Sequence, residues 1–116
     1  MIYPQNTISP KLHKLLDELK INLVNLYGQQ LYSLILFGSQ ARGEATPDSD
    51  IDIMTVLEDP IDVAKEIHKT SEIKFYFIDK YEELISIIPV SRSEFTSSSI
   101  SLIRIAKREG IKLWVK

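Results

Sequence analysis

Leucines recur at helical spacing along the first quarter of the chain. The pattern follows Ser9-Pro10, a serine N-cap with proline at the first helical position, and it stops at Gly28. The residues in phase are Leu12, Leu15, Leu16, Leu19, Leu23 and Leu26. Leucines on one face of a helix are typical of packing against a sheet, and a binding stripe for a partner protein is the alternative. We therefore expect an amphipathic helix between Pro10 and Gly28.

Two runs in the middle of the chain have the character of strands. Residues 34–37, LILF, form a short aliphatic and aromatic run of the kind found in buried strands. A second run starts at Asp50 and alternates, which would place Asp50 and Asp52 on one face and isoleucines on the other. Residues 43–49 between the runs are rich in turn-forming types and predict a surface loop.

The second half of the chain predicts further helices and strands. The cues are an Asp-Pro pair that can start a helix, an apolar run of β-branched and aromatic residues, a proline, a serine-rich stretch and a final alternation. We expect a helix from Asp59-Pro60 to Lys69 with Ile61, Ala64 and Ile67 inward, and then a strand at 73–78. A helix at 80–88, ended by Pro89, and a loop at 91–99 should follow. The last elements should be a helix at 99–109 that buries Ile100, Ile103 and Ala106, and an edge strand at 111–115.

These elements predict a mixed α/β (α+β) fold, with a sheet of about four strands and helices packed on one face. The length of 116 residues and the hydrophobic content of 44% fit one domain, residues 1–116, with one core. Such a chain has no room for a second substrate-binding domain of ordinary size. A partner protein or a second copy of the chain would have to complete any larger site.

Charge and composition exclude some function classes. The formal net charge of −2 argues against a protein that mainly coats nucleic acid. The chain has no cysteine, so it has neither disulfides nor a thiol nucleophile. No apolar run approaches the roughly 18 residues that would span a bilayer, and the N-terminus does not read as a targeting segment. We expect a cytoplasmic protein with no membrane contact.

The candidate chemistry lies between the two middle strands. Asp50 and Asp52 would point the same way, and neighbouring carboxylates repel unless a cation compensates them, so we expect them to share Mg²⁺. Gly38 allows close approach of a phosphate, and the hydroxyl and N–H of Ser39 can donate to its oxygens. Arg42 can neutralise further phosphate charge. The group predicts a site for a metal-bound polyphosphate.

Residues 38–52 also resemble a known family. A Gly-Ser pair, ten intervening residues and Asp-Ile-Asp match the signature of nucleotidyltransferases related to DNA polymerase beta. The string GSQARGEATPDSDIDI is especially similar to the minimal nucleotidyltransferases (MNT), small prokaryotic proteins often encoded beside a HEPN-domain partner and acting as its antitoxin. The resemblance covers roughly residues 34–56, with a looser echo at residues 106–114.

The resemblance implies a polymerase-beta-like nucleotidyltransferase fold and an Mg²⁺-dependent reaction. Its donor would be a nucleoside triphosphate, with ATP favoured, and AMP would pass to a hydroxyl of a HEPN toxin. Asp50 and Asp52 would be the catalytic metal ligands, while Gly38, Ser39 and Arg42 would bind the nucleotide phosphates. A homo-oligomer is also compatible with the resemblance.

One part of the family pattern is incomplete in this sequence. The family usually places a third carboxylate on a neighbouring strand, where the expected strand 73–78 offers lysine and aromatic residues. Glu72 is the candidate third metal ligand, whereas Asp79 is expected to cap the next helix. The alternative function is therefore a catalytically impaired, nucleotide-binding antitoxin that neutralises its toxin by complex formation. A transferase acting on an antibiotic is less favoured, since no domain would hold such an acceptor.

Overall fold

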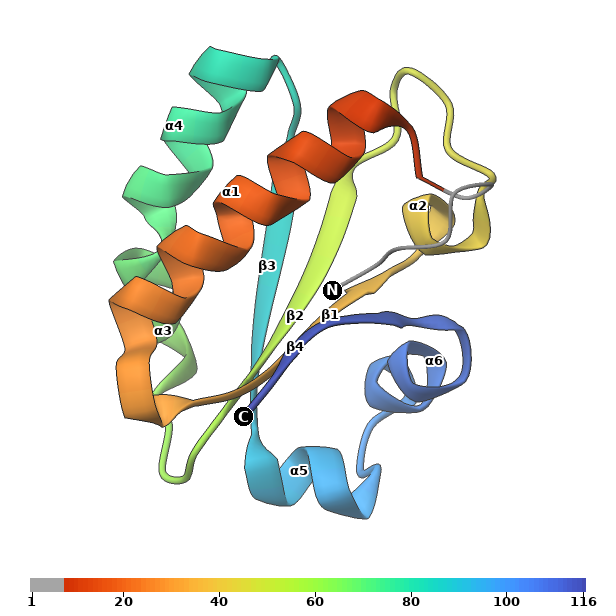
Figure 1. Ribbon diagram of the computed structural model, residues 1–116. Helices are drawn as coiled ribbons and strands as arrows, with labels where there is room; N and C mark the ends of the chain where they lie inside the picture. Colours follow the sequence, from red (N-terminus) through yellow and green to blue (C-terminus); the bar gives the residue numbers. More distant parts are fainter. Residues whose placement is uncertain (1–7) are drawn as a thin grey trace.

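The computed structural model describes residues 8–116 (Figure 1). The first seven residues, where we expect no targeting segment, lie outside the described part. The elements are α1 (Pro10–Tyr27), a 3-10 turn (Gly28–Gln30), β1 (Leu31–Phe37), α2 (Ser39–Arg42), β2 (Ile51–Leu57), α3 (Val63–Lys69), α4 (Ser71–Tyr81), β3 (Ile85–Ser91), α5 (Arg92–Ser97), α6 (Ser101–Glu109) and β4 (Ile111–Val115). Within the described chain, no helix combines the length and apolar character needed to cross a membrane.

The four strands form one mixed sheet in the order β3-β2-β1-β4. β1 pairs antiparallel with β2 and with β4, whereas β2 and β3 run parallel. The parallel pair requires the chain to return between its two strands, and α3 and α4 make that crossover. The predicted mixed sheet, the first helix and the edge strand β4 are confirmed.

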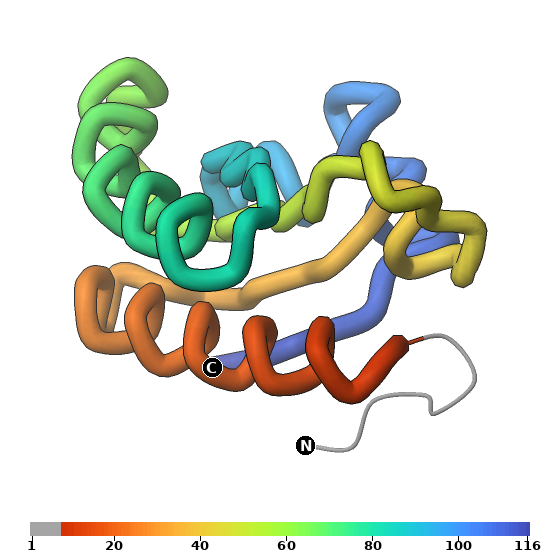
Figure 2. The backbone as a smooth tube through the Cα atoms, turned by 90° about the horizontal axis from the view of Figure 1, so that it is seen from above, coloured from red at the N-terminus to blue at the C-terminus, as the bar shows by residue number. Residues whose placement is uncertain are grey.

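Helices cover both faces of this sheet, not one face as expected. The buried leucines of α1, together with Phe77 and Tyr81 of α4, pack on the face that carries Ile51 and Ile53. α5 and α6 pack on the opposite face in a second, smaller core that was not predicted; its buried members are Ile35, Phe37, Met54, Val56, Val90, Ile103 and Ala106. Figure 2 shows β1 and β4 running between α1 and α5. Alternate residues of β2 therefore face different cores.

The prediction for residues 73–88 is wrong. The expected strand at 73–78 lies inside helix α4, and the expected helix at 80–88 contains the start of β3. Aromatic and β-branched residues favour a strand locally, but Phe77 and Tyr81 are four residues apart and become buried together against α1. Pro89 does not end a helix but lies within β3, which tolerates it because β3 is an edge strand.

Smaller differences concern the ends of helices. The expected loop at 91–99 contains α5, which begins with a capping box between Ser91 and Glu94. α3 begins only at Val63, after the N-cap Asp62, and α6 begins at Ser101. Ile103 and Ala106 are buried as predicted, whereas Ala64, Ile67 and Ile100 are exposed and Ile61 is partly buried.

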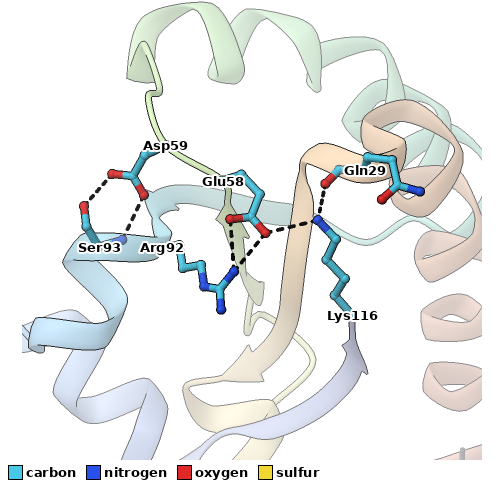
Figure 3. A network of polar contacts seen from close by, with 6 residues as sticks. All are labelled: Gln29, Glu58, Asp59, Arg92, Ser93 and Lys116. Carbon is cyan, nitrogen blue, oxygen red and sulfur yellow. Dashed lines mark hydrogen bonds and ion pairs between the residues drawn. The ribbon is translucent and has the colours of Figure 1, made fainter.

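A polar network fixes the far end of the sheet (Figure 3). Glu58, directly after β2, accepts hydrogen bonds from Arg92 at 3.3 Å and from the Nζ of Lys116 at 3.1 Å. Asp59 accepts from the backbone N–H of Ser93 at 3.0 Å. These contacts join the end of β2, the start of α5 and the end of β4.

Glu18 of α1 anchors α4 through three donors. Its carboxylate accepts from the hydroxyls of Tyr76 and Tyr81, the latter at 2.6 Å, and from Lys80 at 2.9 Å. The hydrogen bonds from Tyr76, Tyr81 and Lys80 lower the pKa of Glu18 from 4.5 to about 2. A lowered carboxyl pKa stabilises the fold above the unfolded-state pKa, and this stabilisation is lost as the pH falls through the folded-state value.

We therefore expect Glu18→Gln to lower the melting temperature at pH 7. The difference from wild type should shrink as the pH falls from about 4.5 towards 2. Thermal melts across this range measure it, with Glu72→Gln, an exposed carboxyl of α4, as the control that should change little. A difference between Glu18→Gln and wild type that is independent of pH would contradict the prediction.

Candidate active site

The site begins where β1 ends, at a glycine pressed against a carboxylate. The antiparallel pairing of β1 and β2 places Phe37 opposite Asp52. The next residue, Gly38, has φ 76° and ψ −159°, a conformation open essentially only to glycine. A Cβ added to Gly38 would collide with Oδ2 of Asp52 and lie 3.4 Å from its Cγ. The backbone turn and the carboxylate are therefore in direct contact.

Asp50 and Asp52 are close enough for their charges to interact. Asp52 lies in β2 and is half-buried, whereas Asp50 is exposed and directly precedes the first strand residue. Burial and then the charge of Asp50 raise the pKa of Asp52, and the charge of Arg42 opposes this rise. Within residues 8–116 the Asp52 carboxylate has no hydrogen-bond donor. It is thus a half-buried anion that lacks a compensating contact from the protein.

Ser39 opens the short helix α2 directly after the glycine. The turn is closed by the N–H groups of Ala41 and Arg42, which donate to the carbonyl of Gly38 at 3.1 and 3.2 Å. The Ser39 hydroxyl has no protein partner in the described part of the chain. This hydroxyl is therefore available to a ligand at the end of β1.

Arg42 is held by two carboxylates. It forms ion pairs with Glu44 at 2.5 Å and with Glu109, the last residue of α6, at 3.1 Å. These two contacts raise the pKa of the Arg42 guanidinium. A phosphate would therefore compete with Glu44 and Glu109 for this side chain. Glu109 could not be predicted as a partner of Arg42, because no local pattern links the end of α6 to the loop after β1.

Glu72 does not lie at the start of a strand, where it is expected as a third metal ligand. It is exposed in the first turn of α4 rather than at the start of a strand. It lies about 14 Å along the helix from the end that leads into β3, at 1.5 Å per residue. In the part of the chain that the structure describes, no three His, Cys, Asp or Glu residues form a group that could hold a metal ion. Glu72 as a third metal ligand is therefore wrong.

Two carboxylates still suit one hard cation. Mg²⁺ is commonly held by one or two carboxylates, with phosphate oxygens and waters as its remaining ligands. The Asp52 carboxylate, which has no hydrogen-bond donor among the described residues, and the adjacent glycine turn fit that arrangement. The chemistry of these residues is therefore suited to a polyphosphate that carries a bound divalent ion.

Comparison with known proteins identifies the family. The model of the nucleotidyltransferase domain family matches residues 12–113. The chain belongs to this family. Two Methanocaldococcus jannaschii proteins named as protein adenylyltransferases are similar to it. One is 32% identical over 103 residues, covering 88% of this chain and 70% of the relative. The other is 31% identical over 84 residues, covering 72% of this chain and 84% of the relative.

Solved structures share the nucleotidyltransferase fold. A Sulfolobus solfataricus structure described as a nucleotidyltransferase has a TM-score of 0.63 at 19% identity, covering 100% of this chain and 93% of its own. A toxin-antitoxin structure with AMP-PNP has a TM-score of 0.62 at 22% identity, covering 86% and 73%. A complex of a tri-AMPylated Shewanella oneidensis HEPN toxin with its MNT antitoxin has a TM-score of 0.54 at 19% identity, covering 89% and 72%. The predicted nucleotidyltransferase family and its fold are confirmed.

Proposed function

We propose that this nucleotidyltransferase transfers AMP from ATP to a hydroxyl group of a HEPN-domain partner protein in the cytoplasm. The observation that carries the proposal is the contact between the Gly38 turn and the Asp52 carboxylate. The turn that we propose as the phosphate site and the carboxylate that we propose as a metal ligand are in contact there, which supports a shared role. The names of the relatives as protein adenylyltransferases support AMP as the transferred group. The AMPylated toxin in one neighbouring structure supports the choice of partner.

Each residue of the site has a role in this reaction. Asp50 and Asp52 would hold Mg²⁺, which neutralises phosphate charge when it is bound. The Ser39 hydroxyl and the turn that Gly38 permits would orient the triphosphate. Arg42 would exchange a carboxylate partner for a phosphate oxygen. These groups position the donor and contribute no covalent nucleophile.

The transfer itself is an in-line displacement at phosphorus. The acceptor oxygen forms a bond to the α-phosphorus while the bond to the bridging oxygen breaks, and pyrophosphate leaves. The proton of the acceptor hydroxyl passes to solvent. Most of the rate would come from positioning and from charge stabilisation.

A second function is favoured by one observation. The described residues provide two carboxylates at the site and no third. A site with fewer charged ligands can retain nucleotide while losing turnover, so the protein would act as an antitoxin by complex formation. The two functions predict different outcomes with the same partner.

The test is transfer of label from ATP labelled at the α-phosphate, with Mg²⁺ and the product of the adjacent gene as the candidate partner. We expect label on the partner with wild type and with Glu72→Gln, and none with Asp50→Ala. Native mass spectrometry of the same mixtures measures complex formation. A tight complex without label transfer from wild type would reject the enzymatic proposal and support the antitoxin function.

A further inference from the structure

The parallel pairing of β2 and β3 determines which residue lies beside Asp52. In the register of this pair, Asp52 is next to Ser86, Met54 is next to Ile88 and Val56 is next to Val90. The last two pairs contact the second core, under α5 and α6. Because strand residues alternate between faces, Asp52 and Ser86 lie on that same face, beyond the covered part. Both are half-buried.

This position is the one from which β3 could contribute to the site. Neighbouring strands are about 4.8 Å apart, so an acidic side chain at position 86 could share a metal ion with Asp52. The chain has serine there, and a neutral hydroxyl does not compensate cationic charge as a carboxylate does. A second divalent ion at this position would therefore lack a carboxylate ligand from β3 and would depend on phosphate and water oxygens.

We propose that Ser86 limits this active site to a single divalent ion, the one bound together with the nucleotide by Asp50 and Asp52. The inference rests on the proposed function for its metal and nucleotide. It identifies residue 86 of β3 as the position where a third carboxylate could complete the site. Replacing Ser86 by aspartate should create a second ion position. Ser86→Asn should not, because asparagine has nearly the shape of aspartate but carries no charge.

The experiment counts ions rather than products. Mn²⁺ binding is followed by electron paramagnetic resonance with an ATP analogue that carries a methylene group between the α- and β-phosphorus atoms and cannot be cleaved there. We expect one bound ion per protein for wild type and for Ser86→Asn, and two for Ser86→Asp. Thermal melts of the same samples should show that Mn²⁺ raises the melting temperature most for Ser86→Asp, because it relieves repulsion with Asp52.

The outcomes separate this inference from the proposed function. Two ions bound to wild type would overturn the inference and leave the proposed function intact, and this count needs no variant. One ion bound to a folded Ser86→Asp would overturn the assignment of residue 86. Wild type that binds neither ion nor analogue would overturn the proposed function and the inference together.

Discussion

Asp52→Asn should reduce AMP transfer by at least about 100-fold and at the same time raise the melting temperature of the metal-free protein. The loss is expected because an amide replaces the more buried of the two proposed metal ligands; even the loss of an outer-shell partner costs 10- to 100-fold. The gain is expected because burial and Asp50 raise the pKa of Asp52, so the fold opposes its ionisation. Label transfer and thermal melts measure the two effects.

The sign of the stability change follows from the pKa direction. A carboxyl with a raised pKa stabilises the fold while protonated, and this contribution is lost as the pH rises through the folded-state value. Asparagine stays uncharged, so the variant should gain on the order of a degree or two at pH 7. The gain should vanish below the ordinary pKa of 3.8. Mg²⁺ with ATP should then stabilise wild type more than the variant.

Asp48→Asn is the matched control for this experiment. Asp48 is an exposed carboxylate of the neighbouring loop, so its loss removes the same charge without touching the turn or the strand. We expect normal transfer and an unchanged melting temperature. If Asp52→Asn keeps full transfer, or if it destabilises the metal-free protein strongly, the assignment of Asp52 as a metal ligand is rejected.

Gly38→Ala should destabilise the fold by about 1–3 kcal/mol and abolish binding of ATP with Mg²⁺. The backbone at Gly38 lies in a region that side chains avoid, at a cost on this scale. The new Cβ would also displace the carboxylate of Asp52. Chemical unfolding measures the first effect, and isothermal titration with ATP and Mg²⁺ at a temperature where the variant is folded measures the second.

Gly28→Ala separates backbone strain from the contact with Asp52. Gly28 also has a positive φ, 53°, but a Cβ there would meet nothing within 4 Å. Its replacement should lower stability and leave ATP binding unchanged. Unimpaired ATP binding by folded Gly38→Ala would show that the contact between Gly38 and Asp52 does not form the nucleotide site.

The amino-acid sequence by itself determined the local parts of this protein. Periodic leucines with a capped start defined α1, and the apolar run and the alternation defined much of β1 and β2. The spacing between Gly38 and Asp52 was enough to indicate the family, because the turn and the strand of the proposed site follow each other in the chain. Such features depend on neighbours in sequence, so a local pattern records them.

Only the tertiary structure determined the secondary structure of residues 71–91 and which of these residues lies beside the proposed site. Residues 73–78 have strand propensity but form part of α4, because burial of Phe77 against α1 outweighs local preference. As a result, Glu72 lies in the first turn of α4 rather than at the start of a strand, and Ser86 of β3 lies beside Asp52. The contact of Arg42 with Glu109 likewise joins residues far apart in sequence. Pairing between distant segments depends on how the core packs. The packing energy comes from residues that are far apart in the sequence, so a short stretch of sequence does not predict it.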